Sequence, residues 1–186
     1  VITSGEGGAV TTDDPALAAR MERLRGQGMD PERRYWFPEV GYNYRLTNVA
    51  CAMLCAQLQR REQLLAQRWR VYRAYDTQLR DVPGLQVQGE LPGRTRSPWL
   101  YPLLVGPEFG ETRDALATRL AAAEVETRPF FIPVHTMPAY LEQASAQGAQ
   151  LPVTDELAAC GLSLPTSSRL SDESVALVAR LVLEGR

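Results

Sequence analysis

The 186-residue chain contains no lysine, a single histidine and only three cysteines. All 20 basic residues are therefore arginines, and with 22 acidic residues they give a formal net charge of −2. This balance argues against a nucleic-acid-binding protein that works through a broad basic surface. An odd number of cysteines does not predict a disulfide framework. Cys51 and Cys55, with the remote Cys160 and His135, do not form a usual zinc ligand pattern, so we predict no metal site.

Long hydrophobic runs are also missing. No apolar stretch approaches the roughly 20 residues that a membrane helix needs, so no membrane association is expected. The first residues, Val-Ile-Thr-Ser-Gly, lack the charged and apolar regions of a secretory signal. With cysteines that need no oxidising compartment, this predicts a cytoplasmic protein. The chain does not begin with methionine, which indicates an internal start.

The first third of the chain has clear local signals. Residues 1–12 predict a β-hairpin that turns at Gly5, Gly7 and Gly8. A helix is expected from Pro15, capped by Asp14, to a stop at Gly26. Residues 27–46 are irregular and rich in aromatic residues. Apolar residues at heptad spacing over 47–81 then predict one long helix that bridges two domains.

The last hundred residues predict a small α/β domain of about three strands packed against helices. The Pro83-Gly84 pair separates it from the long helix. Helices are expected after Thr112, with Leu116 and Leu120 on the apolar face, near 153–160, and over 172–184 after Ser171. Strands are expected at 85–87, 99–105 and 125–128, with a further segment at 162–165.

Two loops could bind a ligand. In Gly41-Tyr42-Asn43-Tyr44-Arg45, an amide and a guanidinium suit an anion such as a phosphate. The alternative is a surface loop whose tyrosines pack on the long helix. The segment 126–140 contains Arg128, His135 and three prolines, and could form a stiff lip beside a substrate. The alternative is a rigid strand-to-loop connection, and for His135 ligand contact is favoured over proton transfer.

These motifs, taken together, resemble the second half of the DegT/StrS family of sugar aminotransferases, which depend on pyridoxal 5′-phosphate (PLP). The similarity lies in the start Val-Ile-Thr-Ser-Gly-Glu-Gly-Gly and in several further segments that occur in the family's order and spacing. These segments are residues 24–30, 34–36, 41–48, 56–58, 99–102 and 128–140. They are most similar to the branch of the family that aminates 4-keto-6-deoxy sugars carried on a nucleotide.

The resemblance implies an α/β fold of the aspartate-aminotransferase type, known as fold type I of PLP enzymes. Residues 1–46 would be the end of the large PLP-binding domain, 47–81 an interdomain helix, and 82–186 the small C-terminal domain. The Schiff-base lysine is expected immediately before Val1, so no catalytic residue lies in this chain. In the family's homodimers, the asparagine matching Asn43 reaches the PLP phosphate of the partner subunit. Arg45, Arg128 and His135 are expected near the amino donor or the sugar nucleotide.

The predicted reaction is transfer of an amino group from L-glutamate to a nucleotide-linked 4-keto-6-deoxy sugar. Two alternatives remain open. A PLP-dependent nucleotide-sugar dehydratase would have histidine in place of the Schiff-base lysine, and the residue before Val1 would distinguish it. A non-catalytic ligand-binding fragment would have an intact mass near 20.6 kDa, whereas the complete enzyme would have about twice that mass.

Overall fold

The computed structural model describes residues 1–148 and 150–184. The chain divides into two compact units, Ile2–Arg61 and Glu62–Arg186, with Val1 grouped with the second. No helix in the described part of the chain is long and apolar enough to cross a membrane.

The first unit contains two helices whose starts follow the local capping signals. Helix α1 spans Pro15–Arg25, and the Asp14 carboxylate accepts hydrogen bonds from the backbone N–H groups of Ala16 and Leu17. Gly26 ends this helix, as the sequence predicts. Helix α2 spans Asn48–Gln59 and is capped by the Thr47 hydroxyl. Residues 27–46 form no helix, and their only bridge pairs Gly26 with Asn43.

The hairpin predicted for residues 1–12 is wrong, because this segment contains no strand. The backbone at Thr3 bonds instead to the side chain of Gln57 on α2, which donates to the Thr3 carbonyl at 2.6 Å and accepts from its N–H at 3.1 Å. Glycine loses more conformational freedom on folding than other residues, so three glycines within four residues weaken any strand here. The backbone of Thr3 is therefore bonded to the Gln57 side chain and not to a second strand.

The single helix predicted over 47–81 is also wrong. Helix α2 ends at Gln59, and α3 spans Arg61–Leu79. Between them Arg60 adopts φ −104° and ψ 13°, and its N–H bonds to the carbonyls of Gln57 and Leu58. No glycine or proline marks this position, so the helix signals of the sequence give no reason to end the helix there.

The second unit is built on a four-stranded antiparallel sheet in the order β1-β2-β4-β3. The strands are β1 Leu85–Val87, β2 Tyr101–Val105, β3 Arg128–Pro129 and β4 Gly161–Leu164. The sequence predicts β1 correctly but starts β2 two residues too early, because a turn joins the Trp99 N–H to the Ser97 carbonyl. The strand expected at 125–128 forms only at 128–129, where it pairs with β4.

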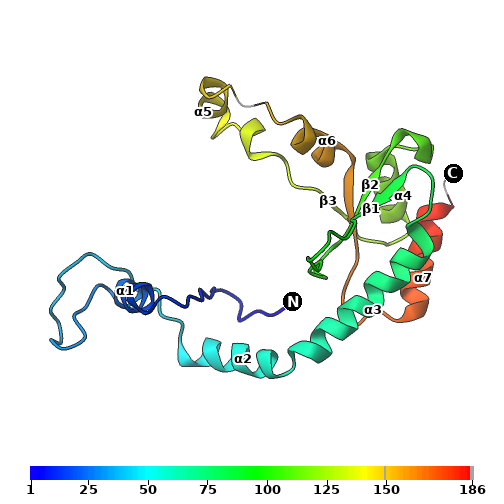
Figure 1. Ribbon diagram of the computed structural model, residues 1–186. Helices are drawn as coiled ribbons and strands as arrows, with labels where there is room; N and C mark the ends of the chain where they lie inside the picture. Colours follow the sequence, from blue (N-terminus) through cyan, green and yellow to red (C-terminus); the bar gives the residue numbers. More distant parts are fainter. Residues whose placement is uncertain (149, 185–186) are drawn as a thin grey trace. The chain divides into compact units, whose positions relative to one another are not determined.

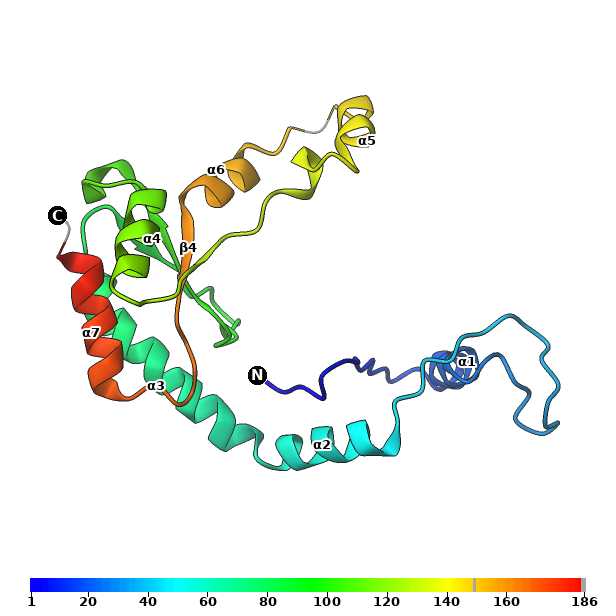
Figure 2. The same ribbon diagram turned by 180° about the vertical axis from the view of Figure 1, so that it is seen from behind.

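Helices flank this sheet, and α3 and α7 lie side by side in both views (Figures 1 and 2). Beyond α3 the helices are α4 Arg113–Ala122, α5 Leu141–Ala146, α6 Pro152–Cys160 and α7 Asp172–Leu183, with short 3₁₀ turns η1 Pro107–Phe109 and η2 Val134–Thr136. Thr112 and Ser171 cap α4 and α7, as the sequence predicts.

One hydrophobic core holds the second unit together. Residues on one face of β2 alternate into it, and α4 and α7 complete it with Leu116, Leu120, Val175 and Val182. This confirms Leu116 and Leu120 as predicted core positions. From α3 the core takes Val71, Tyr72, Tyr75 and Leu79. The intervening residues of β2, Pro102 and Leu104, lie on the opposite face and are only partly covered. That second face carries the groove described below.

The first unit has no comparable core. Among residues 2–61 the only buried residue is Gly28, and eleven large apolar or aromatic side chains are exposed. Helix α2 is mostly apolar and yet has no buried residue. Apolar surface of this extent usually packs against other protein.

Candidate cofactor and substrate sites

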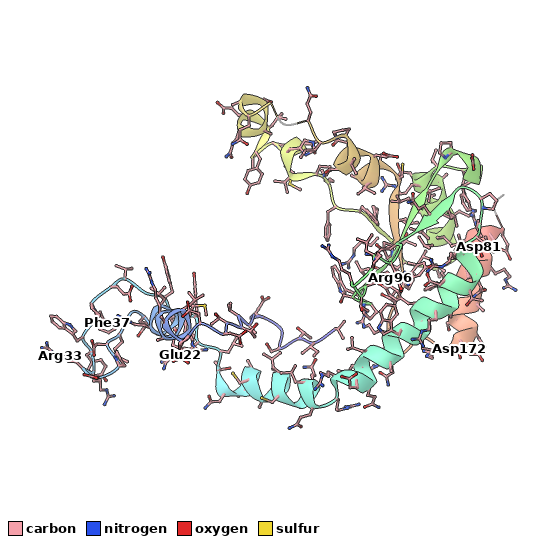
Figure 3. The ribbon with its side chains drawn as sticks, viewed as in Figure 1. Glu22, Arg33, Phe37, Asp81, Arg96 and Asp172 are labelled. Carbon is pink, nitrogen blue, oxygen red and sulfur yellow. The ribbon has the colours of Figure 1, made fainter. Side chains whose placement is uncertain are left out.

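The loop after α1 is closed at its base by backbone pairing. Tyr42 and Tyr44 donate to the carbonyls of Leu24 and Arg25, at 2.7 and 3.0 Å. The two ends pass so closely that a Cβ on Gly28 would lie 2.1 Å from the Glu39 carbonyl oxygen. Only glycine fits there, and its φ of 76° also favours glycine. Figure 3 shows Arg33 and Phe37 on this loop and Glu22 on α1.

This closure fixes the backbone at Asn43, which lies between two tyrosines. The rings of Tyr42 and Tyr44 stack with centroids 5.0 Å apart. Asn43 and Arg45 are exposed, and neither side chain makes a hydrogen bond or ion pair with any residue that the structure describes. An unpaired amide and guanidinium, two residues apart, fit the phosphate of PLP. The chain has no lysine, so it cannot supply the Schiff base.

A groove of about 440 Å³ lies on the open face of the sheet in the second unit. Its floor comes from the strands, one wall from the 88–100 loop, and the other from α6 and the segment that follows β3. The lining residues are Gln88, Ser97, Trp99, Leu100, Pro102, Arg128, Pro129, Phe130, Phe131, Thr154, Leu157, Ala158 and Ser163.

Among the described residues that line it, the groove is mainly apolar and has a single charge. Arg128 is exposed and pairs with no described residue, and no acidic side chain is among the lining residues. Trp99 and Phe131 expose 50% and 73% of their surface, so two flat rings are available to a ligand. This combination suits an anion that carries a planar or sugar group.

The segment after β3 is held against the sheet by local packing. The Phe130 N–H donates to the Gly161 carbonyl at 3.1 Å, and a Cβ on Gly161 would lie 2.2 Å from the Phe130 ring. The guanidinium of Arg113 donates to the carbonyls of Ala158 and Gly161, at the end of α6. The Phe130 ring therefore needs a glycine at position 161.

His135 lies in η2 and is not among the residues that line the groove. Its Nε2 is 3.0 Å from Oδ1 of Asp155 on α6, and its side chain is 16% exposed. The structure therefore brings Arg128 to the groove and pairs His135 with α6. Asn43 and Arg45 lie in the other unit.

Sequence reasoning missed several residues of the groove, including Ser97, Trp99, Thr154 and Ser163. The sequence predicts Trp99 in a strand, where its carbonyl would accept a hydrogen bond from a neighbouring strand. That carbonyl instead accepts from Arg68 at 2.9 Å and from the Thr166 hydroxyl at 2.6 Å. The Ser97-Pro98 pair just before Trp99 is a turn signal that could have placed it in a loop.

The antiparallel sheet, its helices and the loop after α1 match part of solved sugar aminotransferases, so the chain has part of the fold known as fold type I of PLP enzymes. One is DesI, solved in the presence of its TDP-sugar product, which is 31% identical with a TM-score of 0.82 over 100% of this chain and 47% of that chain. The chain belongs to the DegT/DnrJ/EryC1/StrS aminotransferase family, whose model matches residues 1–183.

Curated relatives agree with this membership. GDP-perosamine synthase of Caulobacter vibrioides is 42% identical over 177 residues, which cover 94% of this chain and 47% of that protein. A putative pyridoxal phosphate-dependent aminotransferase of Bacillus subtilis, EpsN, is 26% identical over 98% of this chain and 47% of that protein. The chain thus spans about half the length of these relatives. The family and these names support PLP as the cofactor, and they agree with the branch expected from the sequence.

Proposed function

We propose that the complete protein transfers an amino group from L-glutamate to a nucleotide-linked 4-keto-6-deoxy sugar, with PLP as cofactor. The observation that carries the proposal is the groove, whose described lining residues include Arg128 as their one charge and no acid, in a chain 42% identical to a GDP-perosamine synthase. That relative's name favours GDP as the nucleotide.

In this proposal the groove binds the sugar nucleotide. Arg128 pairs with a phosphate oxygen, because a guanidinium can donate two parallel hydrogen bonds to such a group. Trp99 and Phe131 pack against the flat base or the sugar ring and exclude water from it. Ser97 and Ser163 supply hydroxyls that can bond to sugar oxygens. His135, held by Asp155, fixes the lip near the substrate.

Asn43 would hold the phosphate of the cofactor, and Arg45 would lie near the amino donor or the sugar nucleotide. When bound, PLP supplies an electron sink for the amino acid carbon, and the lysine expected immediately before Val1 would move the proton. The role of this chain is to orient the cofactor. The closed loop fixes the backbone at Asn43, whose side-chain amide donates to the phosphate.

We further propose that the active protein is a homodimer whose sites are shared, so that Asn43 serves the partner's cofactor. The exposed apolar side chains of residues 2–61 support this assembly, because they need cover from other protein. All three cysteines are unpaired, which supports a cytoplasmic location, where thiols stay reduced.

The test uses the complete protein with bound PLP. Addition of L-glutamate should change the visible absorbance of the cofactor, and later addition of a GDP-linked 4-keto-6-deoxy sugar should restore it and give an amino sugar detectable by mass spectrometry. No absorbance change with glutamate would refute the aminotransferase assignment. A deoxygenated product without nitrogen would instead identify a dehydratase.

A further inference from the structure

One wall of the groove has no sheet or helix of its own. Gln88, Ser97, Trp99 and Leu100 line the groove, yet all four lie between β1 and β2 in a segment without regular structure. Residues 89–95 of this segment are exposed. The shape of this wall therefore depends on what holds the 88–100 segment in place.

Three side chains of α3 hold it. Arg68, Tyr72 and Asp76 are spaced by four residues, so they project from the same face of the helix. Arg68 donates to the Trp99 carbonyl at 2.9 Å, and the Tyr72 hydroxyl donates to the Leu100 carbonyl. Both acceptors belong to groove residues.

The third contact runs through Arg96. Its guanidinium donates to the Asp76 carboxylate at 2.8 Å and to the Gln88 carbonyl at 2.9 Å. The Arg96 side chain is only 6% exposed and lies over the rings of Trp69 and Tyr72, 5.6 and 5.8 Å from their centroids. Figure 3 places Arg96 beside α3 and Asp81 past the end of that helix.

Arg96 thus joins both ends of the loop to the helix. Gln88 lies before the exposed residues 89–95, and Ser97 follows Arg96 directly, so one guanidinium closes the loop at its base. Asp76 is itself fixed by the Tyr101 hydroxyl at 2.9 Å and by Arg80 at 2.9 Å. A charged group that is buried and paired on both sides is costly to displace, which makes this closure stiff.

We propose that Arg96, anchored by Asp76, is a positioning residue that sets the wall formed by Gln88, Ser97 and Trp99 for binding the sugar nucleotide. This rests on the proposed function. Arg96 touches neither the groove nor the reacting atoms, so its loss should weaken binding of the nucleotide and leave the reaction with the amino donor unchanged.

The test compares Arg96→Gln with Arg94→Gln in the complete holoprotein. Arg94 lies in the same exposed loop and its side chain pairs with no described residue, so it is a matched control. Arg96→Gln should raise KM for the GDP-linked keto-sugar and Kd for GDP at least tenfold. The rate of the absorbance change with glutamate should stay within twofold of the wild type, and Arg94→Gln should change none of these values.

A second pair of variants separates positioning from folding. Asp76→Asn should reproduce the rise in KM, whereas Asp81→Asn, at an exposed carboxylate just beyond α3, should not. Arg96→Lys keeps the charge but cannot span Asp76 and Gln88 with a planar fork, so its KM should be intermediate. If Arg96→Gln fails to fold, Arg96→Lys decides the question by the same measurements.

Amide hydrogen exchange gives a readout that needs no activity. Residues 86–100 should exchange faster in Arg96→Gln than in Arg94→Gln, with α7 unchanged. Equal KM and Kd values in these two variants, or a fall in the glutamate reaction with KM unchanged, would overturn the proposal. If the wild type does not react with glutamate, the proposed function fails, and equal exchange of 86–100 in both variants would overturn the role of Arg96 by itself.

Discussion

The buried tyrosines predict that this fold loses stability at alkaline pH. Tyr72, Tyr75 and Tyr101 are at most 1% exposed. Burial raises the pKa of all three phenols, and raises the pKa of Tyr72 to about 12. For Tyr101, the hydrogen bond to the Asp76 carboxylate raises the pKa further.

The sign and size follow from the two pKa values of Tyr72. In the unfolded chain the phenol ionises near pH 10, whereas in the folded protein it keeps its proton until about pH 12. The contribution of the neutral Tyr72 phenol to the free energy of unfolding is therefore complete below pH 10 and is lost as pH rises toward 12. At ~1.36 kcal/mol per pKa unit, the loss from Tyr72 alone is about 2 kcal/mol by pH 11.5 and nears 3 kcal/mol above pH 12.

A Tyr72→Phe variant isolates this contribution. At pH 8 it should be less stable than the wild type by about 1–3 kcal/mol, because the partly buried Leu100 carbonyl loses its donor. Between pH 9 and 11.5 that gap should shrink by about 2 kcal/mol, since phenylalanine has no proton to lose. Urea unfolding followed by circular dichroism at several pH values measures the gap.

The control is Tyr140→Phe, at a half-exposed tyrosine whose hydroxyl bonds to no described residue. It should match the wild type at every pH. If the gap for Tyr72→Phe stays constant from pH 8 to 11.5, Tyr72 is not held neutral by burial, and the description of this core is wrong.

Three further substitutions and one control test other parts of the molecule. Asn43→Ala should raise the Kd of PLP at least tenfold, measured by cofactor release on dialysis, because one charge-assisted hydrogen bond of ~1.5–3 kcal/mol is lost; an unchanged Kd would contradict the phosphate role. Arg128→Ala should weaken GDP binding at least tenfold in calorimetry, and equal affinity would remove Arg128 from the nucleotide site. Leu120→Ala, at a fully buried position, should lower the free energy of unfolding by about 2–5 kcal/mol. Leu177→Ala, on the exposed side of α7, should change it by less than about 0.5 kcal/mol.

The sequence predicted the features that depend on neighbouring residues. Asp14, Thr112 and Ser171 each cap a helix where they were expected, because the capping bond joins residues only two or three positions apart. The apolar face of α4 followed from helical spacing for the same reason.

Features set by distant partners could not be predicted in this way. Gln57 captures the backbone of Thr3 across 54 positions, and this contact replaces the expected hairpin. Arg96 forms an ion pair with Asp76, which lies 20 positions earlier in the chain, and a spacing of 20 residues does not indicate that two charges pair. The groove could be predicted only in part for the same reason. Arg128 belongs to a segment that the sequence marks as a ligand site, whereas Trp99 is held at the groove by hydrogen bonds from the distant Arg68 and Thr166.

The heptad stripe of Cys51, Leu58, Leu65, Tyr72 and Leu79 shows why a regular pattern can mislead. Only its last two members enter the core, and the first two are exposed on α2. The stripe therefore joins two helices with different surroundings, one in a unit without a core and one in a unit with its own.

Tyr72 has a second role that the apolar pattern does not show, since its ring packs in the core and its hydroxyl holds Leu100 in the groove wall. Because one side chain serves both, changes to this face of α3 should alter stability and nucleotide binding together, whereas Arg96 should alter mainly the binding.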